Sequence, residues 1–90
     1  MDIDNKTPRR NPKVKVREEE FGKLLLFSGL PLLCINKDAE KIWDLCDGVN
    51  SVSQVIEACA RETKNLEEAR DGVVDFVEEA LRLDLITLEG

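Results

Sequence analysis

The fold is decided by residues 13–43, which read KVKVREEEFGKLLLFSGLPLLCINKDAEKIW. Val14 and Val16 alternate with charged residues, and this period of two is typical of a half-buried strand. Residues 19–22 and 28–31 contain glycine or proline between apolar runs, which indicates turns. We therefore expect a small antiparallel meander. Its strands are predicted from Val14 onward, at Lys23–Phe27 and at Leu32–Ile35.

Helical spacing replaces the alternation after this meander. An apolar stripe at i, i+3, i+4 and i+7 follows Asn36, which is placed as an N-cap. Ser51 and Asn65 mark two further helix starts, because each is followed three residues later by Gln or Glu. The last helix is expected over roughly residues 66–83, and residues 86–88 can form a short final strand. The stripe of the first helix consists of Ala39, Ile42, Trp43 and Cys46, for which we expect core positions.

Charge divides the chain into two parts. Residues 1–13 are polar and contain two prolines, so we expect a flexible N-terminal tail followed by one domain at residues 14–90. Residues 21–90 hold 7 Lys or Arg against 14 Asp or Glu. Such an acidic body repels phosphate, which argues against nucleic acid as a partner.

Catalysis and metal binding have little support in the composition. The chain has no histidine, which removes the commonest metal ligand and the usual base for a nucleophile. Cys34, Cys46 and Cys59 are widely spaced, which favours reduced thiols in the cytoplasm over a disulfide framework. No apolar run is long enough to span a membrane. We expect a cytoplasmic protein that is not an enzyme and uses no cofactor or metal.

The third predicted helix has an unusually wide apolar face. Its apolar positions cover about 180° of the helical wheel, whereas a surface helix needs only about 100° to face its core. Either the domain covers the whole arc, or one flank remains as the wall of a groove. We predict a wall formed by Val73, Val74, Val77 and Leu81, with Arg70 able to pair with an acidic ligand residue. The alternative flank holds Phe76 and Leu83, beside Gly72.

The third predicted strand is the second unusual feature. An unpaired edge strand is a template for another chain and is usually blunted by charge or proline. Neither occurs within the expected strand, so its backbone can accept an extended peptide as a further strand. The alternative is that a helix or the final strand covers it. The residues predicted to contact the peptide here are Leu32, Leu33, Cys34 and Ile35.

Two stretches resemble a known family. LLCINKDAEKIWDLCDGVNSVSQVIEA (residues 32–58) and VVDFVEEALRLDLI (residues 73–86) are similar to the PqqD family. Its members are peptide chaperones, or precursor-peptide recognition elements, of ribosomally made and modified peptides. The resemblance spans roughly residues 14–88. It departs at Asp84, where members dedicated to pyrroloquinoline quinone usually have glycine, and VREEEFGKLLLF (residues 16–27) is closer to mycofactocin-type chaperones.

The resemblance implies a fold and a function. The fold is an α+β, winged-helix-like domain with a three-stranded antiparallel meander followed by three helices. The function is to bind the leader of a precursor peptide along the third strand and against the third helix, and to deliver it to a modifying enzyme of the radical SAM type. Two alternatives stay open: a module that forms homodimers or other protein contacts, and a DNA-binding winged helix. The net charge of −5 over residues 65–84 argues against DNA.

Overall fold

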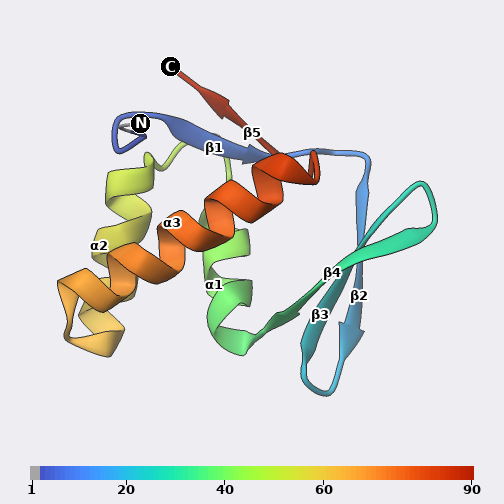
Figure 1. Ribbon diagram of the computed structural model, residues 1–90, viewed down its shortest axis with the longest axis horizontal. Helices are drawn as coiled ribbons and strands as arrows, with labels where there is room; N and C mark the ends of the chain where they lie inside the picture. Colours follow the sequence, from blue (N-terminus) through green and yellow to red (C-terminus); the bar gives the residue numbers. More distant parts are fainter. Residues whose placement is uncertain (1–2) are drawn as a thin grey trace.

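The computed structural model describes residues 3–90, which form two antiparallel sheets and three helices (Figure 1). The predicted α+β class is confirmed, because a three-stranded antiparallel sheet precedes three consecutive helices. In chain order the elements are β1 (Thr7–Arg10), β2 (Val14–Glu19), β3 (Gly22–Phe27), β4 (Leu30–Asn36), α1 (Lys37–Leu45), α2 (Val52–Thr63), α3 (Leu66–Arg82) and β5 (Ile86–Glu89).

Two tight turns fold the β2–β3–β4 meander. Ser28 and Gly29 connect β3 to β4 with φ angles of 54° and 80°, the left-handed values that a two-residue hairpin turn requires. Gly22 begins β3 with φ of 148°, and a Cβ built there would lie 2.1 Å from the carbonyl oxygen of Ile35. A side chain at position 22 would therefore push β3 and β4 apart.

The three helices begin at the residues that the sequence indicated. Asn36 and Asn65 each accept a hydrogen bond from the backbone N–H three residues later, at 2.9 and 3.0 Å. Ser51 accepts the N–H of Gln54 at 3.2 Å, and the side chain of Gln54 accepts the N–H of Ser51 at 2.8 Å. These caps satisfy N–H groups that a helix leaves unpaired at its start, and they fix where each helix follows its loop.

The N-terminal segment departs from the prediction of a flexible tail over residues 1–13. Residues 7–10 form β1, which pairs with β5 in a second sheet. On its other side the segment accepts hydrogen bonds from the loop before α2 and from the start of α2, for example from the N–H of Gly48 to the carbonyl of Pro8 at 2.9 Å and from the N–H of Val52 to the carbonyl of Lys6 at 2.8 Å. The polar composition suggested a flexible tail, but backbone pairing and the burial of Ile3 and Pro8 hold this segment against the domain. Residues 1–2 lie outside the described part of the chain.

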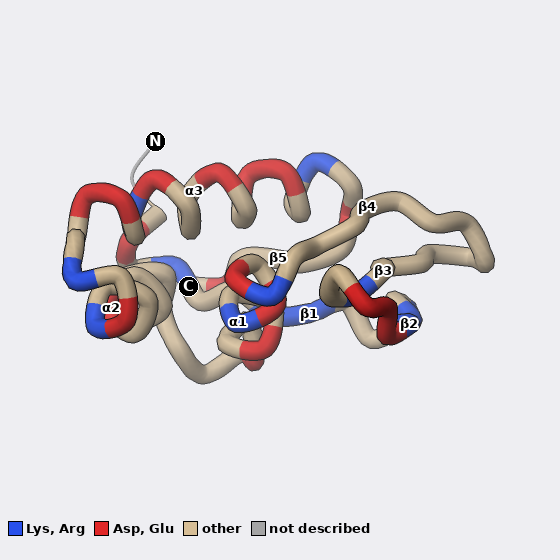
Figure 2. Tube along the Cα trace, turned by 90° about the horizontal axis from the view of Figure 1, so that it is seen from below, with Lys and Arg blue, Asp and Glu red and all other residues tan. Residues whose placement is uncertain are grey.

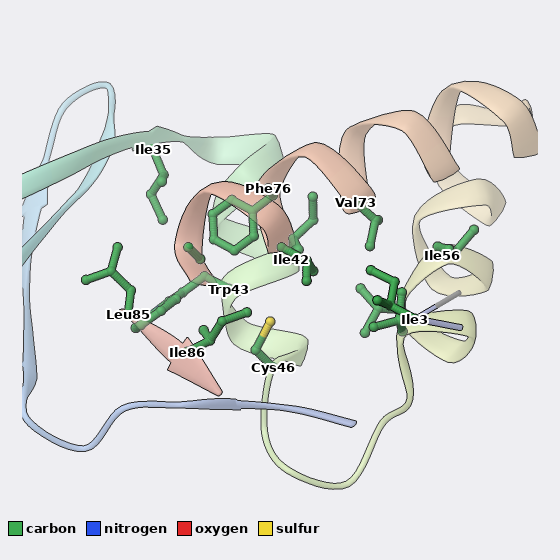
Figure 3. Close-up of a cluster of buried hydrophobic side chains, with 14 of the residues drawn as sticks. Ile3, Ile35, Ile42, Trp43, Cys46, Ile56, Val73, Phe76, Leu85 and Ile86 are labelled. Atoms are coloured by element: carbon green, nitrogen blue, oxygen red, sulfur yellow. The ribbon is translucent and has the colours of Figure 1, made fainter. Parts of the chain in front are cut away.

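One apolar core joins the sheet to the helices (Figure 3). Trp43 is 4% exposed, which confirms its predicted core position. Lys23 of β3 lies on the same side of the sheet as α1, and its ammonium contacts the carboxylates of Glu40 and Asp44 at 3.2 and 3.7 Å. These contacts raise the pKa of Lys23, mainly through the hydrogen bond with Glu40. The meander is thereby tied to α1, and β4 leads directly into that helix.

Candidate functional site

Strand β4 is an outer strand of its sheet. The strand order is β2–β3–β4, so within residues 3–90 no strand pairs with the second edge of β4. β4 begins at Leu30, earlier than the expected Leu32, because the turn needs only two residues; it therefore includes Pro31. Figures 1 and 2 both show β4 on the side of the meander that faces α3. The free edge is thus turned toward the helices.

The side chains of β4 divide between two faces. Leu33 is half-buried and Ile35 is buried, and both pack with the core. Leu32 and Cys34 alternate with them and are exposed. All four were predicted to contact a peptide. The structure places them at the free edge, where one pair borders the core and the other borders solvent.

The residues predicted on α3 fall into two groups. Val73 and Val77 are fully buried, so they belong to the core and offer no surface to a ligand. Val74 and Leu81 are half-buried and line a hollow with Ile3 and Leu88. No residue of β4 lines that hollow. The structure therefore separates this flank of α3 from the β4 edge.

Arg70 lies on the same flank and is held by the N-terminal segment. One nitrogen of its guanidinium lies 2.8 Å from a carboxylate oxygen of Asp4, and this hydrogen bond is the main cause of a lowered pKa for Asp4. Ile3 and Asp4 thus contact the very wall that the sequence suggested for a peptide. These contacts could not be predicted from the sequence, because a single isoleucine in a polar segment shows no periodicity.

The opposite flank of α3 faces the side of the domain that contains β4. Phe76 is 8% exposed and shares the core cluster with Ile35 and Ile42, and Leu83 packs against the same cluster. Figure 3 shows the ring of Phe76 between Ile42 and the strand that carries Ile35. In this view, Phe76 lies on the side of α3 toward the strand that carries Ile35.

Burial lowers the reactivity of two of the three cysteines, Cys46 and Cys59. Cys46 is fully buried, and this burial raises the pKa of its thiol to about 12. Burial also raises the pKa of Cys59, which is half-buried against the core. Cys34 is exposed on β4. A thiol with a raised pKa carries little thiolate at neutral pH, so neither Cys46 nor Cys59 is an activated nucleophile.

The outward face of α3 is acidic. Figure 2 shows carboxylate residues along the whole outer side of this helix. A DNA-recognition helix with this charge would oppose the phosphate backbone. Within residues 3–90, no group of histidine, cysteine or acidic residues is arranged to hold a metal ion. None of the helices described between residues 3 and 90 is long and apolar enough to traverse a bilayer.

Comparison with known proteins identifies a family for this arrangement. The family model described as coenzyme PQQ synthesis protein D (PqqD) matches residues 34–86, which is more than half of the chain. The match begins within β4, includes all three described helices and ends in β5. Searches of curated proteins and of solved structures returned no significant match. PqqD proteins are non-catalytic accessory proteins that act as peptide-binding chaperones in biosynthesis. This chain belongs to the PqqD family.

Proposed function

We propose that this protein binds the leader segment of a ribosomally made precursor peptide by strand addition to β4, and delivers it to a modifying enzyme of the radical SAM type. The observation that carries the proposal is the free edge of β4 on the side of the sheet that faces α3. An extended peptide can pair its backbone with such an edge, while alternate side chains enter neighbouring pockets. The family's peptide-binding role supports the same assignment.

The proposed contacts are those of Leu32, Leu33, Cys34 and Ile35 along the edge. For the helical wall, we replace the flank of Val74, Leu81 and Arg70 by the flank of Phe76 and Leu83. The support for this change is that Ile3 and Asp4 already contact the first flank, whereas Phe76 of the second flank lies toward the strand that carries Ile35 in Figure 3. Val73 and Val77 support the wall from beneath, because both are fully buried.

Strand addition is expected to give the modest affinity that a protein needs if it releases its peptide to an enzyme. Ordering a flexible leader costs about 2–5 kcal/mol, which offsets part of the gain from backbone pairing and apolar contact. A site made of one strand edge and one helix flank should therefore bind with modest affinity. We place this exchange in the cytoplasm, where the three free thiols stay reduced. The acidic face of α3 is the surface we assign to a basic region of the enzyme.

The test uses a matched pair of edge substitutions. Leu32 on β4 and Val16 on β2 are both exposed, at 36% and 42%, on the two outer strands of one sheet. A charge on an edge strand opposes pairing with another chain. Leu32→Asp should therefore weaken leader binding by about 1 kcal/mol or more, roughly fivefold, whereas Val16→Asp should leave it unchanged.

Binding is measured by calorimetry with synthetic leader segments of the short precursors encoded beside the gene. Backbone amide exchange, followed by NMR, should show new protection along β4 when the peptide binds. Equal affinity of both variants, with no protection in β4, would refute strand addition at this edge.

The same edge supports a second candidate function, which is self-association. The exposed leucines Leu30 and Leu32 lie on the free strand, and two copies of β4 can pair around a twofold axis. Light scattering distinguishes the two. A dimer that leader peptides leave intact favours a structural module, whereas a monomer, or a dimer that peptide dissociates, favours the chaperone.

A further inference from the structure

A hollow lies between α1, α2 and α3, beside the helix into which β4 leads. β4 passes into α1 through the cap residue Asn36, and Asp38, two residues later, lines the hollow. Ile42 and Ala69 also line it, with 7% and 5% of their surface exposed, and they give the hollow an apolar floor. A peptide strand that continues past the end of β4 would run toward α1, whose first turn borders this opening.

Gly72 keeps the wall of the hollow open on the side of α3. It lies in the middle of the helix, where glycine is less stable than alanine by roughly 0.5–1 kcal/mol. A Cβ built on Gly72 meets no atom within 4 Å, so packing does not require glycine there. The absence of a side chain leaves space beside Val73 that a ligand side chain can use.

The rim of the hollow is negatively charged. Asp38, Glu62 and Glu68 contribute carboxylates, and Lys41 contributes the ammonium. Lys41 is paired with Glu62, and this hydrogen bond is the main cause of its raised pKa. The remaining two carboxylates, from the first turns of α1 and α3, leave the rim with a net negative charge.

We propose that this hollow receives a lysine or arginine side chain of the bound leader peptide, a preference that rests on the proposed function. The aliphatic stem of such a residue packs on the apolar floor, and its charged end reaches the carboxylates of Asp38 and Glu68. Long basic side chains combine an apolar stem with a charged head in this way. The hollow thus selects one basic residue, placed just beyond the segment that pairs with β4.

A library of random twelve-residue peptides, displayed and selected on the purified protein, tests the preference without knowledge of the natural precursor. Peptides selected by the wild type should carry lysine or arginine at one fixed position relative to their strand-forming residues. Gly72→Leu fills the opening, and its selected peptides should lose this enrichment. Asp71→Leu introduces the same residue next to it on the exposed face and should keep the enrichment.

One selected peptide then tests the charge. Glu68→Gln should weaken its binding about threefold to fivefold, as expected for a solvent-exposed ion pair. Glu67→Gln, outside the hollow, should leave binding unchanged. Replacing the basic residue of the peptide by norleucine should weaken binding to the wild type and remove the difference between the wild type and Glu68→Gln. Circular dichroism of each variant checks that its helices are retained.

The outcomes separate this inference from the proposed function. Selected peptides without a fixed basic position, or an enrichment that survives Gly72→Leu, would overturn the inference while peptide binding stands. Enrichment of an uncharged apolar residue at that position would show that the hollow is an apolar subsite instead, and would overturn it as well. A library that yields no binder to the wild type would overturn the proposed function and this inference together.

Discussion

Ile3→Ala tests whether the N-terminal segment is part of the folded domain. The side chain of Ile3 is 8% exposed and belongs to the core cluster, where it contributes to the hollow beside Val74 and Leu81. The substitution removes three carbon groups at about 0.8 kcal/mol each, and a partly open neighbourhood limits the extra cost of a cavity. We therefore expect the free energy of unfolding to fall by roughly 2–3 kcal/mol.

Urea denaturation measures this change. Trp43 is the single tryptophan and is 4% exposed, so its fluorescence reports the loss of the core. Val49→Ala is the matched control, because Val49 is 80% exposed and its truncation should change stability by less than about 0.5 kcal/mol. If Ile3→Ala were as mild as the control, the segment would not be docked in solution. The flank of Val74 and Leu81 would then be open to a ligand, as the sequence first suggested.

Three further predictions concern single residues. Iodoacetamide should label Cys34 in the native protein and Cys46 only after unfolding, because Cys46 is buried and its pKa is raised to about 12; mass spectrometry of the labelled peptides decides this. Backbone N–H groups, that of Asn50 foremost, hold the pKa of Asp47 below its usual 3.8, so the associated stability is present above pH 3.8 and is lost as pH falls through the lower folded-state pKa. Asp47→Asn should therefore flatten the decline in unfolding free energy below about pH 4, and an unchanged acid profile would contradict this. Gly72→Ala should increase the free energy of unfolding by about 0.5–1 kcal/mol and so raise the melting temperature. A lower melting temperature would show that the glycine is needed for packing.

The elements that local chemistry specifies could be predicted from the sequence. Asn36, Ser51 and Asn65 offer side-chain acceptors to N–H groups three residues away, so each helix start is encoded within a few positions. Ser28 and Gly29 specify a hairpin turn in the same local way. The meander was predicted from the alternation of apolar and charged residues, and the core face of the first helix from its apolar stripe. The structure contains both the meander and the buried stripe.

The features that depend on distant segments could not be predicted. β1 is stabilised by pairing with β5, and no pattern within residues 7–10 indicates a partner at the other end of the chain. The same limit applies to α3. Its wide apolar arc and its two flanks are visible in the sequence, but the contact of Ile3 with the flank of Val74 is not. Which flank adjoins β4 is therefore a property of the assembled fold.

The pairing of β1 with β5 also bears on the order in which the protein folds. The hydrogen bond from the ammonium of Lys6 to the carbonyl of Gly90 joins residues 84 positions apart. Contacts at such separation require closure of a long loop, so they form late, after the local turns and helices. On the ribosome, the β2–β4 meander and α1 can assemble while the start of the chain still waits for its partner strand. The second sheet can close only when residues 86–89 have emerged, and its closure completes the core with Ile3 and Ile86.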